Sequence, residues 1–293
     1  MEEVSLWPGM MKVSCIMASE HIKPGEDRTM AENDKTVALI TGATGVIGHA
    51  IANALAATPN HAIVLLARDE GRAKTAVDAI RRETGNNDVR FVIADVCLRQ
   101  SIQTLADSWS GPLHVLVNDA GVAPRRRETT ADGIELTFAT NVLGYLWMAQ
   151  AFAPHLQRCA PARIVNVASY WAGDLDIDDL EFQRRPFDNH SAYRQSKQAN
   201  RMLTAALADS MAKRGITINA CHPGDPSSVL SRNLGFSGSQ TPEDAALTPV
   251  RLARGEIGAD TTGAYFEHGR EVRCGFARNR ERVDQLYKIC LGY

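Results

Sequence analysis

Short apolar runs alternate with helical segments through most of this chain, and this alternation constrains its fold more than any other feature. The predicted strands are rich in Val, Ile, Leu and Ala and cover residues 36–41, 61–67, 89–94, 113–117, 163–168 and 216–221. Apolar spacing predicts helices between them, including residues 70–83, 136–156 and 191–214. This order predicts a parallel, doubly wound α/β sheet, in which the carboxyl ends of the strands line one ligand-binding crevice.

A glycine-rich turn joins the first predicted strand to the helix that follows it. Gly42, Gly45 and Gly48 are spaced as in turns that bind the pyrophosphate of a dinucleotide. The first glycine permits the tight turn, the second lets the backbone approach the phosphates, and the third lets helix and strand pack closely. The helix N-terminus adds N–H groups that attract anions. The strand before the turn and the helix after it favour this interpretation over incidental glycines.

The end of the second predicted strand indicates which dinucleotide is bound. NAD sites usually carry an acidic residue about 20 residues after the glycines, where it holds the ribose hydroxyls. This chain has Ala67 and Arg68 there, and a guanidinium suits a 2′-phosphate. We therefore expect NADP(H), with NADPH preferred, while the neighbouring Asp69 keeps NAD open.

Polar or small residues follow the other predicted strands. Asp95 follows the third strand, where it could accept from an adenine amino group or cap the next helix. Asn118-Asp119-Ala120-Gly121 follows the fourth, Ser169 the fifth and His222-Pro223-Gly224 the sixth. Because parallel strands end along one edge of a sheet, these residues should converge on one site.

Tyr193 and Lys197 are four residues apart in a predicted helix and so share one face of it. A nearby ammonium favours a phenolate, so we expect the pKa of Tyr193 to fall towards neutrality. A phenol tuned in this way can give a proton to a carbonyl oxygen or take one from an alcohol. Such pairs are common on solvated helices, and it is the convergent strand ends that favour a catalytic role here.

Taken together, these motifs resemble the short-chain dehydrogenase/reductase family over about residues 35–293. The matches occur in the family's order and are Thr41-Gly42-x-x-x-x-x-Gly48 with Gly45 inside, Asp95, Asn118-x-Ala120-Gly121, Asn141, Ser169, Tyr193-x-x-x-Lys197 and Pro223-Gly224. The most similar branch is that of retinol dehydrogenases and protochlorophyllide reductases, through Leu66-Ala67-Arg68-Asp69, Asp178-Asp179-Leu180 and residues 195–200. The resemblance implies a single Rossmann-type domain with a sheet of about seven strands. Residues 1–34 would form a flexible extension before it.

The resemblance also implies roles for individual residues. Tyr193 would be the general acid/base, and Lys197 would lower its pKa and bind the nicotinamide ribose. Ser169 would hydrogen-bond the substrate oxygen, and Asn141 would hold a water in a proton relay. The cofactor contacts implied are Gly42, Thr44, Gly45, Val46, Ile47, Gly48, Arg68, Asp95, Val96, Asn118, Ala120, Gly121, Tyr193, Lys197, Pro223, Gly224 and Ser228.

Three positions depart from the family pattern. Asp119 stands where members commonly have a second Asn, and an Asp loses the donors of an amide and can carry charge. Ser228 takes the place of a Thr that contacts the carboxamide, and Pro226 is unusual in that loop. Residues 225–248 are rich in Gly, Ser and Pro and are expected to form a substrate lid, whose apolar members favour a lipophilic substrate. Tyr170 and Trp171 would add to that apolar wall.

Composition narrows the remaining possibilities. Hydrophobic residues make up 44% of the chain and the formal net charge is -2, which gives nucleic-acid binding no support. The cysteines and histidines are scattered, so we expect reduced thiols and no metal site. The sequence shows neither a bilayer-spanning run nor a signal peptide, and we expect a cytoplasmic protein. Family members often pair through the helices that bear the Asn and the Tyr, which makes a homodimer or homotetramer plausible.

We therefore expect an NADP(H)-dependent oxidoreductase that interconverts a carbonyl and an alcohol on a small, lipophilic substrate, in the direction of reduction. Two alternatives stay open. One is an NADP-binding sensor with little catalysis, which Asp119 favours. The other is an NAD-dependent alcohol dehydrogenase of steroid or retinoid type, which Asp69 keeps in view.

Overall fold

The chain folds around one twisted sheet. The computed structural model describes residues 35–293, and the extension expected at residues 1–34 lies outside them. The strands are β1 (Thr36–Thr41), β2 (His61–Ala67), β3 (Val89–Ile93), β4 (Val115–Asn118), β5 (Ala162–Val167), β6 (Ile216–Cys221), β7 (Tyr265–Glu267) and β8 (Arg270–Val272). Their order is β3-β2-β1-β4-β5-β6-β7-β8. Neighbours pair in parallel from β3 through to β7, which confirms the predicted doubly wound sheet.

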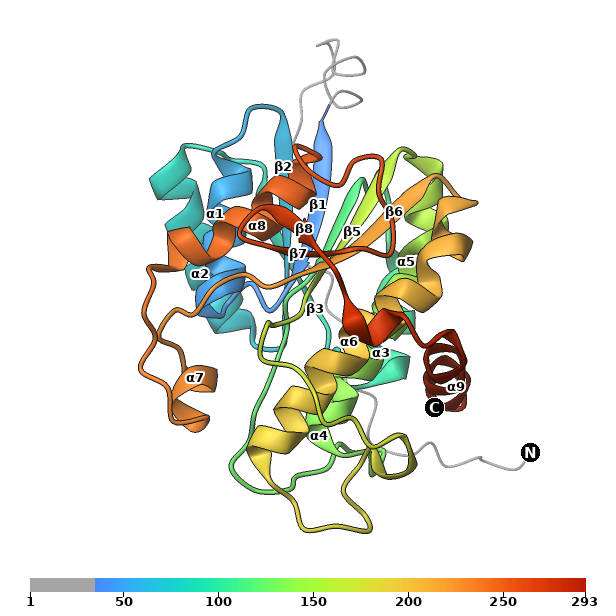
Figure 1. The fold of residues 1–293 in the computed structure, drawn as a ribbon. Helices are drawn as coiled ribbons and strands as arrows, with labels where there is room; N and C mark the ends of the chain where they lie inside the picture. Colours follow the sequence, from blue (N-terminus) through green and yellow to red (C-terminus); the bar gives the residue numbers. More distant parts are fainter. Residues whose placement is uncertain (1–34) are drawn as a thin grey trace, which may run out of the picture.

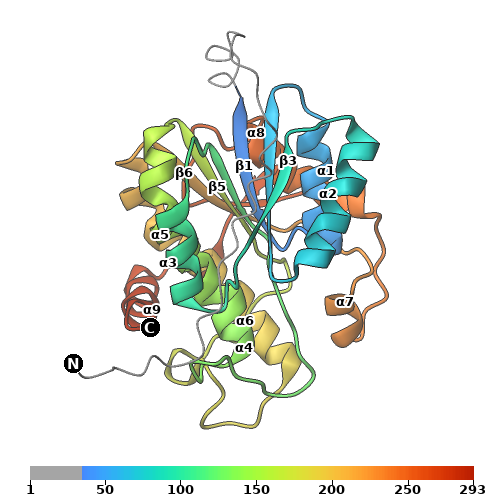
Figure 2. The ribbon, with the colours of Figure 1, turned by 180° about the vertical axis from the view of Figure 1, so that it is seen from behind.

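Helices cover both faces of the sheet (Figures 1 and 2). The longer ones are α1 (Val46–Ala56), α2 (Glu70–Thr84), α3 (Arg99–Ser108), α5 (Gly144–Arg158), α6 (Asn189–Ala212), α8 (Pro242–Arg254) and α9 (Arg280–Leu291). One apolar layer joins α1, α2 and α8 to one face, and the other joins α3, α5, α6 and α9 to the opposite face. Alternate residues of β1 serve the two layers: Ala38 and Ile40 face the first, and Val37 and Leu39 face the second.

The sheet has one strand more than the number expected. Seven strands run parallel, and the short β8 pairs antiparallel with β7 at the edge. His268 and Gly269 connect β7 to β8 and both have positive φ, which suits a two-residue hairpin turn. The resemblance gives only a typical strand number, so it did not contain this local hairpin.

The helix predicted over residues 136–156 is irregular at its start. It consists of α4 (Leu136–Phe138), a π-helical turn η1 (Ala139–Leu143) and α5. Asn141 lies in the middle of that π turn. Such turns are rare inside helices and frequently mark functional sites, because the extra residue rotates the side chains around it.

The lid expected over residues 225–248 is shorter than predicted. It contains a small helix, α7 (Val229–Asn233), and it ends where α8 begins at Pro242. The Thr241 side chain caps α8 by accepting from the Asp244 N–H, and Ala245 and Ala246 are buried in the core. Residues 242–248 therefore belong to helix α8, because Thr-Pro at this position starts a helix.

The C-terminal helix α9 packs on the face of the sheet that carries α6. Val283, Leu286 and Cys290 are fully buried there, in the same apolar layer as Leu203 and Leu207 of α6. This contact covers part of a helix through which pairing was expected, and the homodimer or homotetramer stays a prediction. Within residues 35–293, no helix is long and apolar enough to cross a membrane, and no cluster of side chains could hold a metal ion.

Candidate active site

Tyr193, Lys197 and Ser169 meet at the carboxyl end of β5. The first two lie on successive turns of α6, and Ser169 is the second residue after β5. All three side chains are more than nine-tenths buried. The Tyr193 hydroxyl lies close enough to the Ser169 side chain for that side chain to lower the pKa of Tyr193. The strand end thus presents two adjacent hydroxyl groups, which suits proton transfer to or from a substrate oxygen.

Lys197 lies near this pair and bonds the end of β5. Its Nζ donates to the Val167 carbonyl oxygen at 2.8 Å and lies 5.6 Å from the ring centroid of Tyr193. Burial raises the pKa of Tyr193 to about 12, while the Ser169 side chain acts to lower it. The predicted fall of this pKa towards neutrality is therefore wrong for the chain by itself, because desolvation of the buried phenolate dominates. Burial likewise lowers the pKa of Lys197, to about 8.

Asn141 ties the loop after β4 to α6. Its Nδ2 donates to the Val122 carbonyl oxygen at 3.0 Å and to Ser196 Oγ at 3.1 Å, and its Oδ1 accepts from the Val122 N–H at 2.9 Å. Ser196 immediately precedes Lys197, so this amide holds α6 against the neighbouring loop next to Lys197. The π turn η1 is what brings Asn141 to this position.

Tyr145 is a site residue that the sequence reasoning missed. Its hydroxyl donates to the Val167 carbonyl oxygen at 3.2 Å, so that oxygen accepts from both Tyr145 and Lys197. The Lys197 ammonium also lies 5.5 Å from the Tyr145 ring centroid. Burial raises the pKa of Tyr145 well above its ordinary value, which keeps it protonated as a donor. Its position four residues after Asn141 was the available signal, since i and i+4 residues share a helix face.

The glycine turn after β1 forms a tight cradle. Gly42 has φ +70°, and a Cβ there would lie 2.8 Å from the backbone of Ala120. A Cβ on Gly48 would lie 2.5 Å from the Gly42 carbonyl oxygen. Helix α1 starts at Val46 with Gly45 as its N-cap and no side-chain cap, which leaves its first N–H groups to a ligand. Thr44, Val46 and Ile47 complete the turn, and the cradle fits a pyrophosphate.

Arg68, at the end of β2, is half exposed, and its Nη1 lies 3.9 Å from Asp95 Oδ2. Asp95 also accepts from the Cys97 N–H at 3.1 Å, across Val96, so it orders the turn after β3 without capping α3. Asp69 serves as the N-cap of α2 and accepts from the Arg72 N–H at 2.7 Å. The carboxylate that kept NAD open is therefore engaged in a local structural role.

Two polar residues are adjacent at the end of β4, the amide Asn118 and the acid Asp119. Asn118 is fully buried and its Nδ2 donates to Asn166 Oδ1 at 2.9 Å, which links β4 to β5. Asp119 lies against the glycine turn, so that a Cβ on Gly48 would be 2.7 Å from Asp119 Oδ2. Burial raises the pKa of Asp119 to about 7, while Lys197 and the Gly48 N–H act to lower it. A titratable carboxyl thus stands beside the glycine turn, close enough to Lys197 for the two charges to interact.

The loop after β6 contains three of the predicted cofactor contacts, Pro223, Gly224 and Ser228. Gly224 follows Pro223 with φ +153°, and a Cβ there would lie 2.9 Å from Ala245 Cα, so α8 packs against it. Ser228 caps α7, where its Oγ accepts from the Ser231 N–H at 3.0 Å. The Ser228 hydroxyl therefore caps a helix, a role that was not predicted from the sequence.

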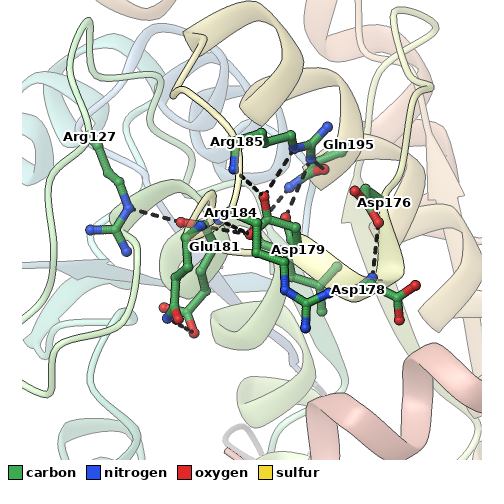
Figure 3. A network of polar contacts seen from close by, with 10 residues as sticks. Arg127, Asp176, Asp178, Asp179, Glu181, Arg184, Arg185 and Gln195 are labelled. Atoms are coloured by element: carbon green, nitrogen blue, oxygen red, sulfur yellow. Dashed lines mark hydrogen bonds and ion pairs between the residues drawn. The ribbon is translucent and has the colours of Figure 1, made fainter.

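A polar network holds the long segment between Ser169 and α6 in place (Figure 3). Asp179 is buried and accepts from the backbone N–H groups of residues 183–185 at 2.6–3.2 Å. Arg185 Nη2 donates to Gln195 Oε1 at 2.6 Å, and Gln195 Nε2 donates to the Leu180 carbonyl oxygen at 2.9 Å. The segment is therefore tied to α6 within one turn of Tyr193.

Aromatic side chains stand beside Tyr193. Trp171 has its ring centroid 5.9 Å from that of Tyr193, 5.0 Å from that of Phe236 and 5.4 Å from that of His190. Leu234, at the end of α7, is buried against Tyr193 and Ala123. These residues come from the segment after β5, the start of α6 and the lid, which all lie below the sheet in Figure 1. They form an apolar wall at the hydroxyl pair.

A tyrosine, a lysine and a serine at one strand end, beside a glycine cradle for a dinucleotide, define a nicotinamide-dependent oxidoreductase. Residues 36–235 match the family model of the short chain dehydrogenases, and the chain belongs to this family, whose members bind a nicotinamide cofactor. It is 31% identical to retinol dehydrogenase 13 of Homo sapiens over 88% of this chain and 84% of that protein. It is 30% identical to a polyprenol dehydrogenase of Danio rerio, over 83% of this chain and 81% of that one. A short chain dehydrogenase from Burkholderia cenocepacia J2315, solved in complex with NADP, is 27% identical with a TM-score of 0.63 and covers 79% of this chain and 95% of its own.

Proposed function

We propose that this oxidoreductase uses NADP(H) to interconvert a carbonyl and an alcohol on a lipophilic substrate, with reduction as its main direction. The observation that carries the proposal is the adjacent pair of Tyr193 and Ser169, both buried beside Lys197 at the end of β5. Two hydroxyl groups in one apolar setting are suited to hold a carbonyl oxygen and protonate it.

Each catalytic residue has a separate task in this proposal. Tyr193 gives its proton to the carbonyl oxygen, and Ser169 stabilises the negative charge that develops on that oxygen. The ammonium of Lys197 stabilises the phenolate that Tyr193 leaves behind, and we assign it the nicotinamide ribose as its ligand. The nicotinamide, when bound, supplies or accepts the hydride. Asn141 fixes the catalytic face of α6, and its role in a water relay stays a prediction.

The preference for NADP(H) is supported by charge at the end of β2. Arg68 presents a half-exposed guanidinium there, which can bind a 2′-phosphate. Asp69, the residue that would favour NAD, is used as the N-cap of α2. The remaining cofactor contacts that we propose are the glycine cradle, Asp95, Val96, Asn118, Ala120, Gly121, Pro223, Gly224 and Ser228.

The lipophilic substrate is supported by the apolar wall of Trp171, Phe236 and Leu234 beside Tyr193. Phe236 is 48% exposed, so it can still bury apolar surface when a substrate binds. Two relatives carry retinol and polyprenol in their names, which are alcohols with large hydrocarbon parts. The cytoplasmic location expected from the sequence stays a prediction.

The direct test is a rate measurement with a panel of retinoid, steroid, aliphatic and aromatic carbonyls, each with NADPH and with NADH. We expect NADPH oxidation that is fastest with the more lipophilic carbonyls. Tight NADPH binding without turnover of any carbonyl would instead favour an NADP-binding sensor. Equal rates with both cofactors would remove the assigned role of Arg68.

A further inference from the structure

Arg201 is a buried residue of α6 that follows Tyr193 and Lys197 at the same spacing. It lies one turn beyond Lys197, as Lys197 lies one turn beyond Tyr193, so the three side chains share one helix face. Each reaches the segment from Val167 to Ser169. Lys197 donates to the Val167 carbonyl oxygen, Arg201 Nη2 donates to the Ser169 carbonyl oxygen, and Tyr193 lies beside the Ser169 side chain. Three successive turns of α6 thus hold three points of the catalytic strand end.

The guanidinium of Arg201 is itself held by Tyr265 and Glu267 of β7. The same Nη2 donates to the Tyr265 hydroxyl at 2.5 Å, and the guanidinium carbon lies 3.5 Å from the Tyr265 ring centroid. Glu267 Oε1 lies 3.7 Å from Arg201 Nη2 and balances its charge. Arg201 is only 8% exposed. A planar guanidinium can stack and donate in its plane at once, which a lysine cannot do.

The serine carbonyl and hydroxyl are coupled through a short stretch of backbone. Ser169 Oγ accepts from the Trp171 N–H at 3.1 Å, so the hydroxyl is oriented by the same turn whose carbonyl Arg201 holds. Rotation of the Ser169 peptide would move both bonds together, because few torsions separate them. The position of the Ser169 hydroxyl beside Tyr193 therefore depends on an anchor at its carbonyl.

We propose that Arg201 is a positioning residue for the Ser169 hydroxyl, which it fixes by clamping the Ser169 main chain between α6 and β7. The consequence for catalysis rests on the proposed function, whereas the clamp itself does not. Arg201 touches neither substrate nor reacting atoms, and it acts only through Ser169.

Amide exchange tests the clamp without any substrate. In Arg201→Met, the Trp171 N–H should exchange with deuterium faster than in the wild type, because its acceptor Ser169 Oγ is no longer held. The Ala168 N–H, which donates to the Cys221 carbonyl oxygen inside the sheet, serves as the internal reference and should keep its protection. Unchanged exchange at Trp171 overturns the proposal.

Arg254→Met is the matched control. Arg254 is a less buried arginine, 31% of whose side chain is exposed, and its Nη2 likewise donates to a backbone carbonyl and a hydroxyl, those of Ala54 and Thr58, but it joins α8 to α1. Its loss should lower stability and leave both Trp171 exchange and turnover as they are. An equal effect of Arg254→Met on Trp171 would show general loosening of the fold and overturn the clamp.

A double-mutant cycle on kcat tests the link to catalysis. We expect Arg201→Met to lower kcat by about tenfold or more in the wild-type background, as small misplacements of catalytic groups do, with the Kd for NADPH unchanged. In the Ser169→Ala background the same substitution should have almost no effect, because the group that it positions is gone. An equal loss in both backgrounds overturns the role assigned to Arg201.

Arg201→Lys extends the test if the Met variant does not fold. It keeps a cation near Glu267 and should show the same pattern in weaker form. A wild-type enzyme that turns over no carbonyl would refute the proposed function, and the Trp171 exchange rate would still decide on the clamp.

Discussion

Lys197 points its ammonium at the Val167 carbonyl oxygen, 2.8 Å away, and not at the hydroxyl of Tyr193 one turn before it. The lysine therefore fixes the strand end that lies beside the phenol. Burial dominates the result, and the pKa of Tyr193 is raised to about 12. At neutral pH the chain holds a protonated phenol, which is the form required to donate a proton to a carbonyl.

The first prediction concerns this phenol in the protein without cofactor. Ultraviolet absorbance of ionised tyrosine, recorded for the wild type minus Tyr193→Phe, should show no ionisation step through the neutral range. The physical reason is the desolvation of a buried phenolate. A difference step near neutrality would contradict this account and restore the pKa expected from the sequence.

The second prediction concerns Asp119, whose pKa burial raises to about 7. The folded protein keeps this proton at pH values where the unfolded chain has lost it. Stability from this group is therefore full below about pH 4 and is lost as the pH rises to about 7, by an amount on the order of a few kcal/mol. Lys197 has a lowered pKa of about 8, so it titrates mainly above this window.

Urea unfolding of the wild type and of Asp119→Asn, at about pH 5 and about pH 7.5, measures the effect. The wild type should lose stability between the two pH values relative to the variant, whose amide does not titrate. Parallel changes in both proteins would show that Asp119 is not the titrating group.

The third prediction concerns Arg68. Arg68→Ala should raise the KM for NADPH by about tenfold or more, because a charge-assisted bond to the 2′-phosphate is lost. The KM for NADH should change little. Lys74→Ala, which removes one exposed positive charge from α2, is the control for the general potential. Equal effects of Arg68→Ala on both cofactors would refute the assignment.

The fourth prediction concerns the apolar wall. Phe236→Ala should raise the KM for a lipophilic carbonyl several-fold, roughly the effect of losing part of an apolar contact, and leave the KM for NADPH unchanged. Leu247→Ala is a fitting control, because Leu247 is 58% exposed on α8. If both variants behave alike, Phe236 does not contact the substrate.

The fold could be predicted well because its determinants are local and repeated. The apolar runs before Gly42, Ser169 and Pro223 each specify a buried strand, and the helices between them require parallel pairing. The hairpin of β8 and the start of α8 were missed although both have local signals, in His268-Gly269 and in Thr241-Pro242. The expectation of a lid over residues 225–248 outweighed the signal at Thr241-Pro242, and the typical strand number of the resembled family did not include the hairpin.

The sequence predicted which residues would lie together at the candidate site, but it did not predict the pKa values of their side chains. Residue spacing places Tyr193 and Lys197 on one face, but it does not report burial, which sets the pKa of both. The π turn at Asn141 and the reach of Arg201 to Ser169 depend on packing between distant segments. Such long-range contacts leave no periodic trace in the sequence.

The most direct test of the central claim is the rate of carbonyl reduction with NADPH by the wild type and by Tyr193→Phe, with NADPH binding measured in parallel. The account predicts that the variant loses about a hundredfold to ten-thousandfold in kcat, as expected for a general acid, and binds NADPH as the wild type does. Wild-type turnover by Tyr193→Phe would contradict the account, because the buried hydroxyl pair at the end of β5 would then not be the proton donor.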